Sequence, residues 1–144
     1  MNVKGGTIYR NVLGGGSLAT VGSPKIKQPD YAAIKGTTPA DWGKQSLNLV
    51  TIGGGLKADG TVNLVEIGEA TGVNAGYGGN VFGGSRGEGE ATLGSSFASF
   101  ATSIWTRVHI LNGAHIRGNV FGGGNNGEVM KDSDVIIGEK ANGN

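Results

Sequence analysis

Cysteine is absent from this chain of 144 residues, and proline occurs only three times. Without cysteine, a disulfide framework and a cysteine-ligated metal site are both excluded. No apolar run approaches the roughly 18 residues that a membrane-spanning helix requires, and residues 1–6 do not have the pattern of a secretory signal. We therefore expect no membrane-spanning segment.

Charge of one predominant sign is missing as well. The chain has 12 Lys and Arg residues against 11 Asp and Glu residues, and no basic block is interleaved with aromatic residues. A nucleic-acid partner is therefore not expected.

Glycine, by contrast, is abundant, with 30 residues. The glycines follow no G-X-Y period, which excludes collagen, and a 37% share of hydrophobic residues is too high for a disordered linker. Glycine at fixed places within an apolar pattern predicts a backbone that turns often.

The glycines belong to two repeated motifs. Residues 79–84 and 118–123 both read G-N-V-F-G-G, and residues 11–16 read N-V-L-G-G-G. Residues 50–53, 65–68 and 135–138 have the form V-x-I-G, and Val108-His109-Ile110 repeats its core with Gly113 slightly later. Apolar residues two apart predict strands with one buried face, and the glycine after each strand predicts a corner.

The spacing of these motifs predicts the fold class. Val135 follows Val108 by 27 residues, with Val120 between them, so two strand types are expected to alternate within a repeat of that length. Short strands, glycine corners and this period predict an all-β fold, a parallel β-helix or β-solenoid of about 3–5 coils. We expect one such domain over 1–144, a piece of a longer repeat protein, with inserted loops at about 23–46 and 89–104.

The predicted core consists of inward-facing Val and Ile residues, with Glu66 and His109 facing outward. The residues expected in the core are Val65, Ile67, Val108, Ile110, Val120, Val135 and Ile137.

The other motif predicts ladders between coils. Asn11, Asn80 and Asn119 are expected at left-handed corners, each hydrogen-bonded to the Asn of the next coil; the alternative is a solvent-facing turn residue. Leu13, Phe82 and Phe121 are expected to form a column, inside or outside the coil. Positive φ is expected at Gly83 and Gly122.

The second insertion also permits a helix. Phe97, Phe100, Ala101, Ile104 and Trp105 follow helical spacing, which favours a short helix over the alternative of an irregular loop.

No residue is assigned to catalysis, to a cofactor or to a metal. Gly122, Gly124 and Gly127 match a dinucleotide fingerprint formally, but no helical pattern follows them. Residues 125–128 and 132–134 lack the spacing of a known calcium loop, and His109 and His115 have no partner ligands at metal-binding spacing. The carboxylates Glu66, Glu69, Glu88 and Glu90 are sufficient in number, but not in pattern, for a carbohydrate-cleaving site.

Three aromatic residues are candidate ligand contacts, because their rings could stack on sugars: Trp42, Tyr77 and Trp105. For Trp105 the alternative is that it packs the insertion onto the coil.

Residues 116–138 resemble a repeat found in large glycine-rich surface proteins of Bacteroidetes, of the form I-x-G-N-V-F-G-G-G-N-x-G-x-V…V-x-I-G; 76–87 match it partly and 5–22 loosely. The resemblance implies a β-solenoid stalk or adhesin-like segment, extracellular or at the cell surface, with no catalytic residues to transfer. We expect a non-enzymatic structural or adhesive segment. The alternative is a carbohydrate-binding or carbohydrate-active β-helix fragment with its site on the insertion loops.

The expected partners follow from this interpretation. They are flanking repeats of the parent chain, or other copies in end-to-end association, together with host or microbial glycans or proteins. The edges of the first and last coils carry unpaired backbone groups that could template further strands.

Overall fold

The computed structural model describes residues 1–21, 47–73, 75–76, 78–87 and 101–138. Within these ranges the chain is all-β and has no helix. The strands are β1 (Asn2–Val3), β2 (Gly6–Ile8), β3 (Val12–Leu13), β4 (Leu47–Ile52), β5 (Val65–Ile67), β6 (Val81–Phe82), β7 (Thr102–Ser103), β8 (Trp105–Ile110), β9 (Ala114–Ile116), β10 (Val120–Phe121), β11 (Glu128–Val129) and β12 (Ser133–Ile137).

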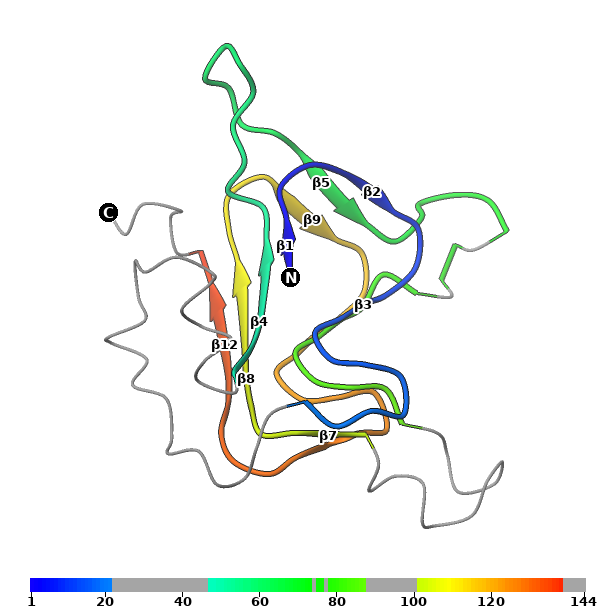
Figure 1. Cartoon of the computed structure of the whole chain (residues 1–144). Helices are drawn as coiled ribbons and strands as arrows, with labels where there is room; N and C mark the ends of the chain where they lie inside the picture. The colour runs from blue at the N-terminus through cyan, green and yellow to red at the C-terminus, as the bar shows by residue number, and fades with distance from the viewer. Residues whose placement is uncertain (22–46, 74, 77, 88–100, 139–144) are drawn as a thin grey trace.

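These strands form four sheets, and every pairing between them is parallel (Figure 1). The first sheet has the order β1-β4-β8-β12, the second β2-β5-β9, the third β3-β6-β10 and the fourth β7-β11. The chain passes from the first sheet to the second and third, then in its later passes through the fourth, and returns to the first. We call each pass a circuit. This arrangement is consistent with a β-solenoid.

The repeat length predicted for the last circuit is confirmed. Val135 pairs in the first sheet with Val108, and Asp134 pairs with Arg107. In both pairs the partners lie 27 residues apart in the sequence. The expectation of only two alternating strand types is wrong. Val65 and Val108 carry the same V-x-I motif, but β5 belongs to the second sheet and pairs with Ala114–Ile116.

The corner glycines of the V-x-I-G motif have the expected conformation. Gly53, Gly68 and Gly138 have φ of 91°, 99° and 88°, and Gly113, which follows Ile110 by three residues, has φ of 86°. Residues other than glycine rarely adopt a positive φ. Each of these glycines therefore allows the chain to turn toward the next sheet after its strand.

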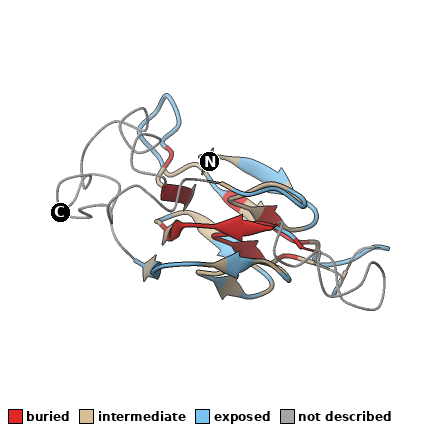
Figure 2. Cartoon of the chain, turned by 60° about the horizontal axis from the view of Figure 1, so that its bottom comes forward, coloured by how far each residue is buried: buried red, intermediate tan, exposed pale blue. Residues whose placement is uncertain are grey.

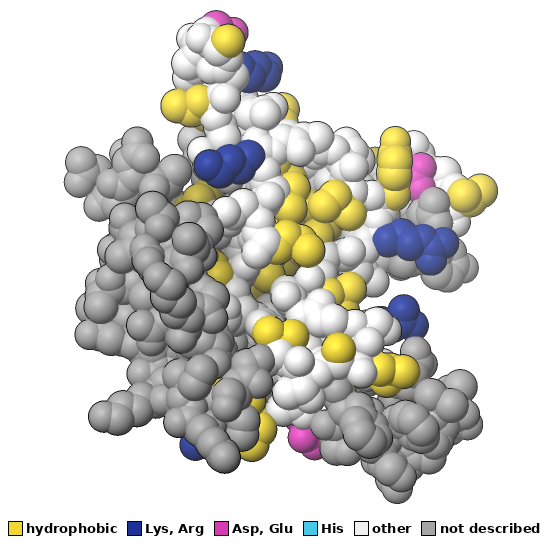
Figure 3. All heavy atoms as spheres, in the orientation of Figure 1, with side chains coloured by type: hydrophobic (Ala, Val, Ile, Leu, Met, Phe, Trp, Pro, Cys, Tyr) yellow, Lys and Arg dark blue, Asp and Glu magenta, His cyan; other side chains and the backbone are white. Residues whose placement is uncertain are grey.

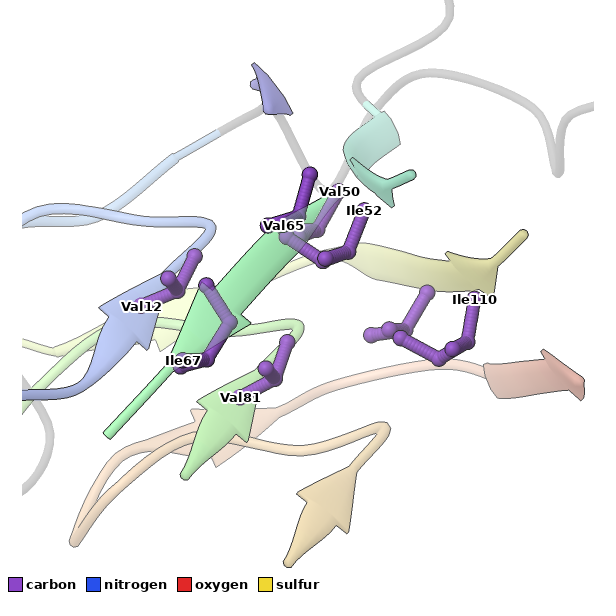
Figure 4. Close-up of a cluster of buried hydrophobic side chains, with 8 residues drawn as sticks. Val12, Val50, Ile52, Val65, Ile67, Val81 and Ile110 are labelled. Atoms are coloured by element: carbon purple, nitrogen blue, oxygen red, sulfur yellow. The ribbon is translucent and has the colours of Figure 1, made fainter. Parts of the chain in front are cut away.

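The core lies between the first three sheets (Figure 4) and consists almost wholly of Val and Ile from the middle strands. Its buried members are Val12, Val50, Ile52, Val65, Ile67, Val81, Val108 and Ile110. Four predicted core residues are thus confirmed, Val65, Ile67, Val108 and Ile110. Glu66 and His109 lie on the other side of their strands, half-buried.

Three other predicted core residues are less buried, because they lie in the last strands of their sheets. Val120 is half-buried, while Val135 and Ile137 are 40% and 70% exposed. The prediction of burial is wrong for Val135 and Ile137. Their sequence motif matches that of β4 and β8, but β12 is the edge strand of the first sheet. Figure 2 shows the buried strands in the middle of the stack, with exposed strands above and below.

Two further features differ from expectation. The helical pattern is wrong where it can be checked, because Thr102–Ser103 is strand β7 and Trp105 begins β8; Phe97 and Phe100 lie outside the described residues. An arm between β4 and β5 was not predicted. It projects from the body in Figure 1, and its closing contacts are a bridge between Leu56 and Val62 and a hydrogen bond from the Lys57 N–H to the Thr61 carbonyl, 2.8 Å.

The inserted loop expected at 23–46 lies wholly outside the described residues, as does most of the one expected at 89–104.

Candidate functional site

The third sheet carries an asparagine ladder, as predicted. The Oδ1 of Asn11 accepts hydrogen bonds from the backbone N–H and the Nδ2 of Asn80, at 3.0 and 3.2 Å. The Oδ1 of Asn80 accepts the same pair from Asn119, at 2.9 and 3.3 Å. The expected left-handed corner is wrong, because none of the three residues has positive φ. The side chain alone therefore links the circuits, without a strained backbone.

A hydrophobic column runs beside this ladder. Leu13, Phe82 and Phe121 are in register, and the two Phe rings stack with centroids 4.9 Å apart and an angle of 11° between their planes. Val12 and Val81 belong to the core, and side chains alternate along a strand, so the column faces away from the core. This settles the side of the strand on which these residues lie.

Glycines at the ends of these strands allow the circuits to approach closely. The prediction of positive φ at Gly83 and Gly122 is wrong. A Cβ added at Gly14 would overlap the carbonyl oxygen of Gly83, and one added at Gly83 would overlap that of Gly122. The constraint that selects glycine at 14 and 83 is thus the space between circuits.

A polar network occupies the corner where the circuits return to the first sheet. The Asn48 Nδ2 donates to the Ser103 Oγ at 3.0 Å, and the Ser103 and Ser85 hydroxyls lie 3.2 Å apart. Ser85 and Ser103 are fully buried, and the Ser85 hydroxyl donates to the carbonyl of Ala19 at 3.0 Å. Because these groups satisfy one another, the network joins two circuits at a place where polar atoms lie inside the fold.

An outward cluster of polar and charged side chains lies on the second sheet. The Nδ1 of His115 lies 2.9 Å from one oxygen of Glu66, and the Nη2 of Arg117 lies 3.2 Å from the other. The hydrogen bond with His115 is the main cause that lowers the pKa of Glu66, and the positive charge of Arg117 adds to the effect. The carboxylate therefore stays ionised and links β5 to β9.

The calcium-loop interpretation considered for residues 132–134 can be compared with the contacts of Asp134. Its Oδ2 accepts hydrogen bonds from the Nε and Nη2 of Arg107, at 3.0 and 2.7 Å. The carboxylate thus serves as a cross-strand ion pair. Within the described ranges, no group of three or more His, Cys, Asp or Glu side chains could hold a metal ion.

The three aromatic candidates occupy different positions. Trp42 and Tyr77 lie outside the described residues. Trp105 is 1% exposed and packs with Leu47 and Ile104. This burial favours the packing role for Trp105, and ligand contact by the other two stays a prediction.

Sequence reasoning missed the Glu66–His115–Arg117 cluster and the buried serines. Glu66 and His115 lie 49 residues apart, and Asn48 and Ser103 lie 55 apart, so only the register of the sheets brings them together. The V-x-I motif indicates that Glu66 faces outward, but nothing in the sequence indicates that His115 is its partner.

The part of the chain that the structure describes contains no helix long and apolar enough to cross a membrane. No protein family model, curated protein or solved structure matches this chain.

Proposed function

We propose that this chain is a non-enzymatic structural or adhesive segment, a β-solenoid that serves as part of the elongated body of a secreted or cell-surface protein. The observation that carries the proposal is the asparagine ladder, in which each circuit supplies the hydrogen bonds that the next one requires. Each step of the ladder involves only two neighbouring circuits, so the same contacts can form in a stack of any length. The ladder therefore suits a body that extends by repetition.

The other cross-circuit contacts support the same proposal. The stacked Phe rings, the Arg107–Asp134 pair and the His115–Glu66 pair each join neighbouring circuits through side chains on the outer faces of the sheets. Such contacts stabilise the stacking of one circuit on the next rather than the walls of a ligand-binding pocket. Location at the cell surface, with flanking repeats as partners, rests on the resemblance of residues 116–138 to bacterial surface repeats.

Labelling of intact cells tests the location. An antibody raised against this segment should bind unpermeabilised cells of the source organism, and brief external proteolysis should remove the signal. Labelling that appears only after permeabilisation would contradict a surface role.

A carbohydrate-binding or carbohydrate-active role is the alternative, and one observation favours it. The Glu66–His115–Arg117 cluster presents hydrogen-bonding groups on an outward face, and Tyr9, which is exposed, follows β2 in the same sheet. Charged and polar side chains suit sugar hydroxyls, and an exposed aromatic ring suits sugar ring faces.

A glycan array and a reducing-sugar release assay distinguish the two roles. A purely structural segment gives neither selective binding nor sugar release. Selective binding that Glu66→Gln weakens would establish the alternative, whereas binding that Glu66→Gln leaves unchanged would place the glycan on another surface.

A further inference from the structure

Among the described strands, none pairs with the outer side of β10 in the third sheet or of β12 in the first sheet, at the end of the stack. β10 and β12 are edge strands, and their apolar side chains are far more exposed than the residues paired with them. Phe121 is 43% exposed where Phe82 is 8%, and Ile137 is 70% exposed where Ile110 is 8%. Each exposed residue occupies a position that, one circuit earlier, is covered by a neighbour. The edge therefore has the shape of a surface that accepts another circuit.

The first circuit is open at the opposite end of the stack. Its apolar residues Val3 and Ile8 pack against the core but are only half-buried. Figure 3 looks onto this end and shows hydrophobic side chains gathered between β1, β2 and β3. In addition, β1 covers little of its neighbour, because it pairs only with Thr51 and Ile52 of the six-residue β4.

The two ends are complementary in their hydrogen-bonding groups. In the asparagine ladder, the Oδ1 of one circuit always accepts from the N–H and Nδ2 of the circuit that follows. At the last circuit the Oδ1 of Asn119 accepts from none of the described residues. At the first circuit, the N–H and Nδ2 of Asn11 donate to none of them. One end thus offers an acceptor, and the other end offers the two donors that it binds.

We propose that the last circuit is a docking surface for the first circuit of a second copy of this chain, arranged head to tail. This inference rests on the proposed structural function and names its partner. In the docked register, Asn11 of the second copy donates to the Oδ1 of Asn119. Val12 of that copy covers Val120, and Leu13 covers Phe121, as they cover Val81 and Phe82 within one chain.

Docking in this register requires an exchange of strands in the first sheet. In the docked register, β12 of the first copy and β1 of the second copy would occupy the same position in the first sheet. Both strands align with the same two residues of that sheet, because Asn2 and Val3 pair with Thr51 and Ile52, and Ile136 and Ile137 reach the same positions through β8. The five-residue β12 has more residues available to pair with β4 than the two-residue β1. We infer that β12 replaces β1 of the second copy and pairs with its β4.

The alternative arrangement, with two last circuits facing each other, is disfavoured by the same groups. It would place the acceptor of Asn119 against a second Asn119 acceptor. It would also require antiparallel pairing of β12, in a molecule whose sheets are parallel throughout the described strands.

Two variants that each block one end test the proposal. Ile137→Lys places a charge on the last circuit, and Ile8→Lys places one on the first. Val73→Lys is the matched control, because Val73 is 90% exposed in the connection after β5 and belongs to neither end. Sedimentation velocity over a hundredfold concentration range measures association, and circular dichroism checks that each variant is folded.

The wild-type chain and Val73→Lys should gain mass as concentration rises, whereas each end-blocked variant alone should stay monomeric. A 1:1 mixture of Ile137→Lys with Ile8→Lys should form a dimer and nothing larger, because one open head and one open tail remain. A monomeric wild-type chain, or dimerisation of Ile8→Lys alone, would overturn the proposal.

Hydrogen exchange supplies a second measurement should Ile8→Lys fail to fold. In the wild-type chain, the amides of β12 should exchange at least tenfold more slowly at high concentration than at low concentration. Exchange of β12 that is independent of concentration would also overturn the proposal. The reducing-sugar release assay reports separately on the proposed function, so sugar release by a chain that associates would contradict that function alone.

Discussion

Asparagine at the start of a third-sheet strand is expected to stabilise the structure more inside the stack than at its end, because an inner residue has circuits on both sides. The Asn80 side chain accepts from Asn119 and donates to Asn11, while the Asn119 side chain accepts from none of the described residues. The two residues have the same identity and the same local sequence. They therefore form a matched pair in which position in the stack is the principal difference.

Asn80→Ala should lower the free energy of unfolding by about 1–2 kcal/mol, since it removes the side-chain hydrogen bonds that Asn80 makes with both Asn11 and Asn119. Asn119→Ala should cost less than half as much, because it removes only the weaker donation from its Nδ2. Urea unfolding of both variants measures the difference. Equal losses would show that the ladder adds nothing beyond local turn preference.

Gly83→Ala should destabilise the fold by more than about 2 kcal/mol, because its Cβ would overlap the Gly122 carbonyl oxygen in the neighbouring circuit. Gly123→Ala is the control, since a Cβ there meets no atom within 4 Å and its φ is not positive. It should be neutral or slightly stabilising. Thermal unfolding of both variants tests the argument, which fails if their melting temperatures fall equally.

At the scale of the element, a strand's burial depends on its level in the sheet and not only on its own sequence. β8 and β12 carry equivalent apolar pairs, but only β8 lies between two other strands of the first sheet. The V-x-I motif predicts which side chains share a face. It cannot predict that the face of the last strand is uncovered, because that depends on what lies beside it.

Ile110→Ala should cost about 2–5 kcal/mol, as expected for truncation of a buried aliphatic side chain. Ile137→Ala at the paired position should cost under about 1 kcal/mol, because that side chain is already largely in solvent. Denaturant unfolding at low protein concentration, where association is minimal, compares the two. A cost at Ile137 equal to that at Ile110 would contradict the exposure seen here.

The link between β5 and β9 should weaken in acid. The folded pKa of Glu66 lies below its ordinary value of 4.5, so its contribution to stability is fully present above that value and is lost as pH falls through the folded pKa. The Glu66 side chain is half-buried at the surface, where solvent screens its charge, so the effect is small. Melting temperatures measured from pH 7 to pH 3 should decline less in Glu66→Gln than in the wild type. Parallel declines would indicate that the His115–Glu66 contact does not couple to folding.

Sequence patterns predict the repeating part of the molecule well, because equivalent positions in successive repeats have the same environment and therefore carry the same residue types. The corner glycines at 53, 68 and 138, the asparagine ladder and the Phe column all follow from recurrence. Contacts between unlike residues far apart do not recur. The pairing of Glu66 with His115 depends on a register that the irregular lengths of the earlier circuits conceal.

At the scale of the whole molecule, stability should be graded from the middle of the stack to its ends. The fully buried Val and Ile residues belong to the second and third circuits, while Val3 and Ile8 of the first circuit and Ile137 of β12 are partly in solvent. Interactions in a stack of this kind are mainly between neighbours, so the ends are expected to open first.

Native-state hydrogen exchange should therefore show the slowest amides in β4, β5 and β8 and the fastest in β1 and β12. Dilute protein is required, so that docking between copies does not protect the ends. Uniform protection over all of these strands would indicate a single cooperative unit and contradict the gradient.

The unequal lengths of the circuits also set an order for folding. Arg107 meets Asp134 across 27 residues, whereas Asn11 meets Asn80 across 69. Contacts close in sequence form faster, so the strands from β8 to β12 are expected to nucleate the fold and the first circuit to join last. During synthesis this order is reversed by the direction of the chain. At about 5–20 residues per second, the first circuit waits several seconds for its neighbour, with its strand edges open to chaperones or to other nascent chains.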